Sequence, residues 1–265
     1  WHVICASFSE PRHLMASTGL LLKPIGEMTL DGYRMVLSNQ TIATGYMNTI
    51  IYVIGATTIG VTLTILAGFV TSRKNLMFKR PILAFIMFTM MFNGGLIPTY
   101  MIIRKIGWVG TRWALLIPGA ANAFYIVIMK SAFEQLPDSY EESAKIDGAG
   151  FFTIMLKILV PLVKSTIAVI VLFTVVIQWN SWFPASIYVP TKRELWPLQL
   201  VMREILVQNE SSQFISGADA AELSDMVKEL VRYTTAVVGT LPVLCVYPFV
   251  QKYFVKGVTL GGVKG

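Results

Sequence analysis

Charged residues are scarce in this sequence: they make up 14% of the 265 residues, whereas 54% are hydrophobic. An ordinary soluble domain contains roughly 25% charged residues. The mean hydropathy of +0.62 excludes an intrinsically disordered chain, which needs low hydrophobicity and high charge density. A large soluble core is still compatible with this composition, so the spacing of the charged residues decides the class.

Cysteines and basic clusters are also rare. The two cysteines, Cys5 and Cys245, are too few for a disulfide scaffold or a cysteine-rich zinc site. The histidines, His2 and His13, show no metal-ligand spacing, so we expect no metal site. The net charge of +7 is small and is spread between apolar segments, which argues against a nucleic-acid partner.

Five long segments contain no charged residue at all: residues 35–72, 81–103, 113–129, 165–191 and 233–251. Each reaches or approaches the roughly 20 residues that cross a bilayer as a helix. Five such segments in one soluble domain would be improbable. We therefore predict membrane spans at residues 45–71, 81–103, 113–131, 158–183 and 231–251. The apolar residues 1–7 are expected to be the end of a further span.

The basic residues give only a weak prediction of orientation. If residues 72–80, 130–164 and 252–265 share one side, that side carries eleven Lys and Arg residues, and the opposite side also carries eleven. Cytoplasmic loops are usually the more basic ones. Charge density favours the first set as cytoplasmic, because it contains fewer loop residues.

The predicted span 81–103 is interrupted by Asn93-Gly94-Gly95 and Pro98. Glycine pairs and proline loosen a membrane helix, and broken helices are common near transport pathways. Close helix packing through small residues explains the same pattern equally well.

The segment 134–161 is the most informative one, because five of the fifteen acidic residues lie within 134–147. Ser139, followed three residues later by Glu142, predicts a capping box just after Pro137. Gly148 and Gly150 predict the end of that helix. Crossing a membrane does not require a short, partly exposed helix between two spans, so we interpret it as a docking site for a partner.

This segment resembles the EAA motif of permease subunits in binding-protein-dependent ABC importers, E-A-A-x-x-D-G-A followed by L-P after a hydrophobic stretch. The matching positions are Glu142, Ser143, Ala144, Asp147, Gly148, Ala149 and Pro161. Ser143 is a small departure from alanine. The stretches EQLPDSYEESAKIDGAG and QWNSWFPAS resemble the carbohydrate importers, in particular the maltose-permease-like and LplC/YtcP-like groups.

The resemblance implies an all-α integral membrane protein: the transmembrane domain of a type I ABC importer, with about six spans, the first only partly present. It implies a bacterial cytoplasmic membrane location, with the coupling (EAA) loop 134–161 and the C-terminus in the cytoplasm. The implied partners are membrane lipid, a second homologous permease subunit, two ATPase subunits that bind ATP and Mg, and an extracytoplasmic solute-binding protein that delivers an oligosaccharide. The implied ATPase-coupling residues are Glu141, Glu142, Ser143, Ala144, Asp147, Gly148, Ala149, Lys256 and Gly257.

Catalytic signatures are missing from the sequence. It contains no phosphate-binding loop and no cluster of His, Asp and Cys, so we expect a non-catalytic subunit without a cofactor of its own. The predicted spans contain no carboxylate, which argues against the alternative of an ion-coupled secondary transporter. A permease of the same superfamily that imports an amino acid or a peptide is the other alternative.

Polar and aromatic residues in or beside the spans are the candidates for the substrate path. They are Asn93, Asn122, Tyr125, Gln178, Trp179, Asn180 and Trp182. For each of them, hydrogen bonding between helices or membership of an interfacial aromatic belt is at least as good an explanation as contact with a sugar.

Overall fold

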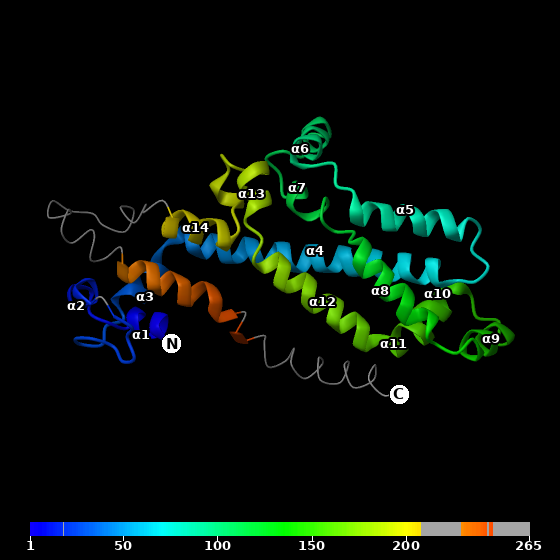
Figure 1. The fold of residues 1–265 in the computed structure, drawn as a ribbon, viewed down its shortest axis with the longest axis horizontal. Helices are drawn as coiled ribbons and strands as arrows, with labels where there is room; N and C mark the ends of the chain where they lie inside the picture. Colours follow the sequence, from blue (N-terminus) through cyan, green and yellow to red (C-terminus); the bar gives the residue numbers. More distant parts are fainter. Residues whose placement is uncertain (18, 208–228, 243, 246–265) are drawn as a thin grey trace. The chain divides into compact units, whose positions relative to one another are not determined.

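The computed structural model describes residues 1–17, 19–207, 229–242 and 244–245 (Figure 1). All regular elements in these residues are helices, as predicted. The chain divides into two compact units. Unit 1 comprises residues 1–51 and 179–247, and unit 2 comprises residues 52–178 and 248–265.

The predicted span 45–71 lies within α4 (Gln40–Ser72). This helix has 33 residues, which corresponds to about 50 Å at 1.5 Å per residue. Within the described residues, α4 is the helix that by itself is long and apolar enough to cross a membrane. Its glycines allow close packing: a Cβ on Gly60 would lie 2.7 Å from the carbonyl oxygen of Ala120.

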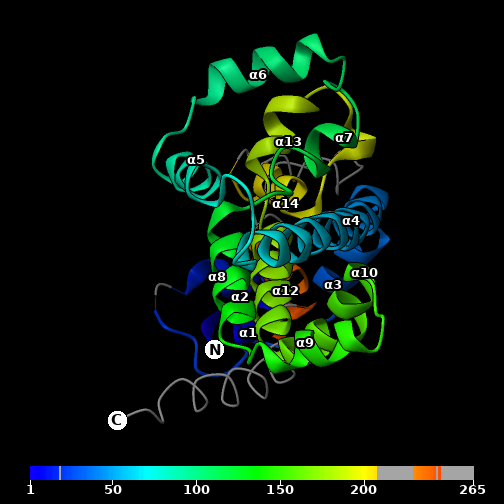
Figure 2. The ribbon, with the colours of Figure 1, turned by 90° about the vertical axis from the view of Figure 1, so that its right-hand side faces the viewer.

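The predicted span 81–103 forms two helices, α5 (Lys79–Met91) and α6 (Leu96–Lys105), bent by 113° (Figure 2). The bend lies at Asn93-Gly94-Gly95, which confirms the predicted interruption. Gly95 has φ +84° and ψ 172°, a conformation that is essentially restricted to glycine. The Asn93 side-chain oxygen accepts a hydrogen bond of 3.0 Å from the Gly95 amide. The pair is long and apolar enough to form one broken span or a re-entrant loop.

The predicted span 113–131 contains two helices, α7 (Trp113–Leu116) and α8 (Ala123–Glu134), with a non-helical connection between them. The Asn122 side chain caps α8 by accepting hydrogen bonds from the amides of Phe124 and Tyr125 at 2.9 and 3.4 Å. Asn is a preferred N-cap residue because its oxygen pairs amides that otherwise lack an intrahelical partner.

The segment after α8 is bent. It contains α9 (Ser139–Ile146), α10 (Phe151–Thr153), the π-helix η1 (Ile154–Leu159), α11 (Val160–Leu162) and α12 (Lys164–Trp179). The axes of 151–162 and α12 meet at 82°, so the predicted span 158–183 consists of α12 and the bend that precedes it. Pro161 and the π-helical stretch lie next to the bend, and both features are frequent causes of sharp kinks.

The core of unit 2 joins these helices. Its buried members are Phe69, Tyr125, Met129, Phe133, Ala144, Ile154, Met155, Leu159, Val163 and Ile170. Among these buried residues, α9 contributes Ala144 alone. The predicted docking helix therefore packs into the core through one small side chain.

Unit 1 contains the chain's described outer segments: α1 (His2–Ser7), α2 (Pro11–Ala16), α3 (Asp31–Ser38), α13 (Phe183–Tyr188), the 3-10 helix η2 (Arg193–Leu195), α14 (Leu198–Val207) and helical residues 229–242. The Asn48 amide donates hydrogen bonds to the carbonyls of Glu194 and Trp196 at 2.7 and 3.1 Å. The Thr49 hydroxyl accepts one from the Leu198 amide at 2.8 Å. These buried polar groups are therefore paired within the unit, as burial requires.

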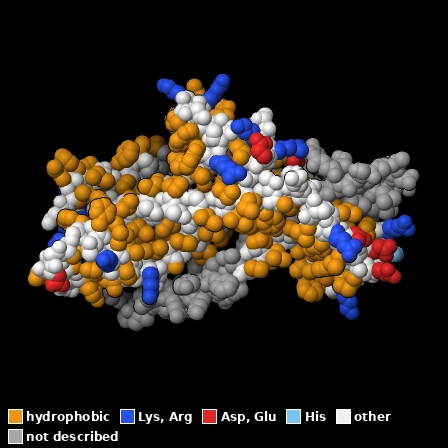
Figure 3. All heavy atoms as spheres, turned by 180° about the vertical axis from the view of Figure 1, so that it is seen from behind, with side chains coloured by type: hydrophobic (Ala, Val, Ile, Leu, Met, Phe, Trp, Pro, Cys, Tyr) orange, Lys and Arg blue, Asp and Glu red, His pale blue; other side chains and the backbone are white. Residues whose placement is uncertain are grey.

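The described surface is rich in hydrophobic side chains, as Figure 3 shows for one face. None of the residues of α5 is buried, and Phe85, Met87, Phe88 and Met91 are all exposed. Such a surface is typical of a helix that contacts lipid or another membrane helix, because exposing so many large apolar side chains to water is unfavourable.

Candidate coupling site

The start of α9 differs from the sequence prediction. The N-cap residue is Asp138, Ser139 is the first helical residue, and no side-chain capping bond is present. The predicted capping box of Ser139 and Glu142 is therefore wrong. The box is absent because Ser139 lies inside the first turn and not at the N-cap position, and the carboxylate of the actual N-cap residue, Asp138, is ion-paired with Lys74.

The end of α9 follows the prediction. Gly148 has φ +79°, and its amide donates a 3.0 Å hydrogen bond to the carbonyl of Lys145. The Ala149 amide donates one of 2.9 Å to the carbonyl of Ala144. These two bonds form a Schellman motif, in which glycine adopts the left-handed conformation at low cost. Gly148 thus permits the tight turn that the sequence indicated.

The two faces of α9 have different surroundings. Ala144 is 6% exposed and packs into the core of unit 2. Glu142, Ser143 and Asp147 are exposed, and Ile146 is 86% exposed. The helix therefore presents a short free surface with two acids and one large aliphatic side chain.

Glu141 lies on the inner side of the helix, unlike Glu142. Its carboxylate is ion-paired with Arg73, and its other oxygen lies 2.9 Å from the Lys145 ammonium. The Arg73 and Glu141 side chains are only 22% and 16% exposed. Burial lowers the pKa of Arg73, an effect that nearby Asp138 and Glu134 oppose. Glu141 thus has a contact within this chain, although the sequence grouped it with Glu142.

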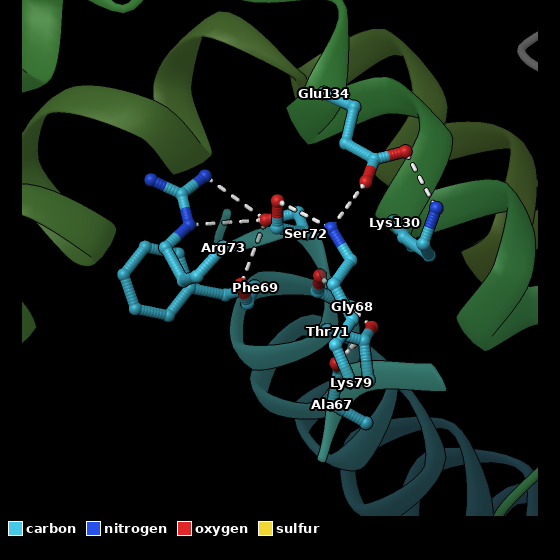
Figure 4. A network of polar contacts seen from close by, with 9 residues as sticks. All are labelled: Ala67, Gly68, Phe69, Thr71, Ser72, Arg73, Lys79, Lys130 and Glu134. Carbon is cyan, nitrogen blue, oxygen red and sulfur yellow. Dashed lines mark hydrogen bonds and ion pairs between the residues drawn. The ribbon is translucent and has the colours of Figure 1, made fainter. Parts of the chain in front are cut away.

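Arg73 is also fixed to the end of α4 (Figure 4). Its guanidinium lies 4.7 Å from the centre of the Phe69 ring. It donates hydrogen bonds from Nε and Nη2 to the Ser72 hydroxyl, at 3.2 and 2.9 Å. A cation above an aromatic face is attracted by the ring quadrupole. The side chain is therefore oriented before it meets Glu141.

A second set of ion pairs joins the start of α5 to α8 (Figure 4). The Glu134 carboxylate lies 3.0 Å from Lys79 and 2.5 Å from Lys130. Partial burial raises the pKa of Glu134, but the hydrogen bonds from the two lysines outweigh it and lower the pKa overall. Lys74 lowers the pKa of Asp138, and Asp138 raises the pKa of Lys74. The lowered pKa of Glu134 and of Asp138 and the raised pKa of Lys74 all favour the charged forms of these side chains.

A pocket of about 640 Å³ lies between these segments. One wall is formed by residues 72–76, and another by Asp138, Glu141, Glu142 and Lys145 of the α9 region. Phe133 and Leu159 contribute apolar surface. The ion pairs of Arg73 and Lys74 connect the two walls, so they determine how far apart these walls lie.

The sequence prediction missed the roles of Arg73, Lys74 and Lys79. The available signal was a basic segment, 72–80, on the side that was also assigned to the acidic segment 134–147. The ion pairs bring these two segments together, in agreement with their assignment to one side of the membrane.

Three of the predicted substrate-path residues have local partners in unit 2. Asn93 bonds within its own turn, Asn122 caps α8, and Tyr125 is buried in the core. Gln178 is partly exposed near the end of α12. Asn122 and Tyr125 are joined by the capping hydrogen bond, and the contacts of Asn93, Asn122 and Tyr125 stabilise local elements.

The two tryptophans predicted for the substrate path, Trp179 and Trp182, lie in unit 1. The Trp179 indole N–H donates a 3.3 Å hydrogen bond to the carbonyl of Gly239. The Arg203 guanidinium lies 3.6 Å from the centre of the Trp182 ring. Asn180, between them, is exposed. Trp179 is thus a buried packing residue, whereas Trp182 forms a cation–π pair. The predicted coupling residues Lys256 and Gly257 lie outside the described residues.

Comparison with known proteins is consistent with this arrangement. Residues 60–260 match the family described as "Binding-protein-dependent transport system inner membrane component". The chain is 36% identical to the polygalacturonan/rhamnogalacturonan transport system permease protein YtcP of Bacillus subtilis (strain 168), covering all of this chain and 91% of YtcP. It is 33% identical to Protein LplC of the same organism, covering 100% of this chain and 88% of LplC.

A solved structure has the same fold. It is a bacterial ABC transporter involved in the import of the acidic polysaccharide alginate, and one of its chains matches with a TM-score of 0.87 and 30% identity. The match covers 96% of this chain and 89% of that chain. The chain therefore belongs to the binding-protein-dependent transport system inner membrane component family and is a permease subunit of an ABC importer.

Proposed function

We propose that this chain and a second homologous permease subunit form the membrane pathway of an importer for oligosaccharides. A solute-binding protein delivers the oligosaccharide on the outer face of the cytoplasmic membrane. Two ATPase subunits bind ATP and Mg on the cytoplasmic face, where residues 134–161 and the C-terminus of this chain lie. The present chain transmits the movement of the ATPase subunits and hydrolyses nothing itself.

The exposed face of α9 is the observation that carries this proposal. Glu142, Ile146 and Asp147 are available to a partner, while Ala144 and Glu141 hold the opposite side of the helix. Glu142 lies in the first helical turn, where the helix dipole favours a negative charge. We assign Glu142 to contact with basic groups of the ATPase, with Ser143 and Asp147 on the same exposed surface. At this joint Gly148 and Ala149 form the turn that ends α9, and Ala144 fixes the helix to the core of unit 2.

The relatives support a carbohydrate as the substrate. YtcP is a permease for polygalacturonan and rhamnogalacturonan, and the structural relative takes part in alginate import. MdxG of Bacillus subtilis, 28% identical, is a maltodextrin permease. Because two of these relatives handle acidic polymers, we propose oligosaccharides that contain uronic acids as the first class to test.

Uptake into proteoliposomes tests the substrate class. The complete complex is reconstituted with its solute-binding protein, and uptake of a labelled oligogalacturonide is compared with uptake of a maltodextrin of equal length. We expect ATP-dependent uptake of the uronate oligomer. Uptake of amino acids or peptides in place of either sugar would overturn the carbohydrate assignment.

Charge reversal at Glu142 tests the coupling role. In Glu142→Lys, we expect stimulation of the ATPase by the binding protein to fall about tenfold, because the reversed charge repels basic groups of the ATPase. Glu27→Lys provides a control with the same charge change at an exposed position of unit 1. Full stimulation and transport in Glu142→Lys would contradict the coupling role.

A further inference from the structure

We propose that Arg73 is a positioning residue that tethers α9 to the end of α4, so that a movement of α9 reaches α4 directly. The proposal rests on the function of α9 given above. It concerns contacts within this chain and not the contact with the ATPase.

The helix α9 has little to hold its orientation. It has eight residues, of which Ala144 alone is buried, and an isolated helix of that length is unstable in water. Pro137 and Asp138 precede it, and the turn at Gly148 follows it. Its direction therefore depends on contacts with other elements.

Arg73 provides a contact that is fixed to α4. It follows Ser72, the last residue of α4, and its guanidinium is held by the Phe69 ring and the Ser72 hydroxyl. The Ser72 hydroxyl in turn donates a 2.7 Å hydrogen bond to the carbonyl of Phe69. A charge that is oriented in this way transmits force with little side-chain rearrangement.

The pair of Arg73 with Glu141 lies in a protected environment. Both side chains are largely covered, so salt screens the pair less than it screens an exposed one. Removing one partner of such a pair leaves the other charge without compensation, which costs more than the pair itself contributes. The contact is therefore sensitive to substitution at either position.

Lys74 provides a second attachment point. It pairs with Asp138, three residues before Glu141, so that the two acids lie on one side of the helix start. Both side chains of this pair are exposed, at 77% and 63%, so it is a weaker contact than the covered pair of Arg73 and Glu141. Lys79, bound to Glu134 at 3.0 Å, fixes the other end of the basic segment against α8.

These contacts separate two adjacent acids by role. Glu141 is directed to Arg73 inside the chain, and Glu142 is exposed to a partner. A pull on the outer face of α9 thus reaches the cytoplasmic end of a 33-residue helix through one ion pair. The covalent route to α4 is much longer, because it passes through α8, α7, α6 and α5.

The experiment compares Arg73→Glu, Glu141→Arg and the double variant that exchanges the two charges. Each is reconstituted as the complete complex with its binding protein, and sugar imported per ATP hydrolysed is measured. We expect each single variant to lower this ratio about tenfold, because two like charges then face each other, while the ATPase subunits still co-purify. The exchange is expected to restore most of the ratio, which a general folding defect would not do.

Arg80→Glu is the matched control, since it reverses an exposed charge in the same basic segment. We expect its ratio to equal that of the unmodified complex. An unchanged ratio in Arg73→Glu, or a double variant as poor as the single ones, would overturn the tether.

A double-mutant cycle separates the tether from the proposed function. The thermal midpoint of the complex is measured for Arg73→Ala, Glu141→Ala and both together, and we expect the shifts to be non-additive. If the unmodified complex neither binds the ATPase nor imports sugar, the proposed function fails and the tether's role in coupling fails with it, whatever the cycle shows. If the complex imports sugar normally but the shifts are additive, the tether alone is overturned.

Discussion

Arg73, immediately after α4, is ion-paired with Glu141 in the first turn of α9. The pair lies beside the ring of Phe69 and is mostly shielded from solvent. Two segments that are distant along the chain are therefore joined by a charge contact at the place where the permease is expected to meet its ATPase.

The turn after α9 depends on the conformation of Gly148. At φ +79°, an alanine would adopt a left-handed conformation, which costs roughly 1–2 kcal/mol. We expect Gly148→Ala to lower the thermal midpoint of the complex and its sugar-to-ATP ratio. A Cβ at Gly148 or at Gly150 would contact nothing within 4 Å, but Gly150 has φ −74°. Gly150→Ala therefore isolates the backbone effect, and equal losses in both variants would contradict it.

Close packing of α4 depends on Gly60. A Cβ there would lie 2.7 Å from the carbonyl oxygen of Ala120, which belongs to the backbone and has little freedom to move. Overpacking of this kind costs roughly 1–3 kcal/mol, so we expect a lower thermal midpoint in Gly60→Ala. Gly119→Ala, where a Cβ meets nothing within 4 Å, is expected to be nearly neutral. A Gly60→Ala protein with an unchanged thermal midpoint would show that α4 and the segment containing Ala120 lie further apart than the 2.7 Å contact requires.

Two substitutions of Asn122 distinguish a structural role of this residue from contact with the substrate. Because its side chain caps α8, Asn122→Ala is expected to lose about 1 kcal/mol of stability. Asn122→Asp retains the capping oxygen and is expected to keep both stability and the KM for the sugar. Measuring thermal midpoint and transport kinetics together checks this. A raised KM in Asn122→Asp, with stability intact, would instead place Asn122 on the substrate path.

The pair of Lys74 and Asp138 predicts a dependence on acid pH. The hydrogen bond from Lys74 holds the pKa of Asp138 below its usual range, with a smaller effect of Arg73. The unfolded chain then binds a proton at a higher pH than the folded chain does, so stability is present above the usual Asp pKa of about 3.9 and is lost as pH falls below it. We expect Asp138→Asn to reduce the slope of the thermal midpoint with pH in this acidic range. The same slope in both proteins would contradict the pairing.

The sequence predicted features that depend on local backbone chemistry. The interruption at Asn93-Gly94-Gly95 and the turn at Gly148 are both present, because each requires a conformation that glycine adopts easily. The long apolar run within α4 also produced a helix of the expected kind. Such signals come from neighbouring residues, so they are visible in the sequence alone.

The ion pairs around α9 were not predictable in the same way. Arg73 and Lys74 follow the end of α4 and Lys79 lies on α5, so only the folded chain brings them to Glu141, Asp138 and Glu134. The capping box was wrong because the helix starts one residue earlier than predicted, with Asp138 and not Ser139 at the N-cap position. The different orientations of Glu141 and Glu142 likewise depend on where Arg73 lies. The sequence indicated the acidic cluster but could not show which of its residues pair within the chain and which remain exposed.

The most direct test of the account is site-specific cross-linking from the exposed face of α9. Ile146→Cys is prepared in a chain whose two native cysteines, Cys5 and Cys245, are replaced by serine, and a cysteine-reactive photo-cross-linker is attached. Thr191→Cys, at an exposed position of unit 1, serves as the control. We predict a covalent product with the ATPase subunit from position 146 and none from position 191. Efficient labelling at 146 without any ATPase product in an actively transporting complex would contradict the central claim that α9 is the coupling helix.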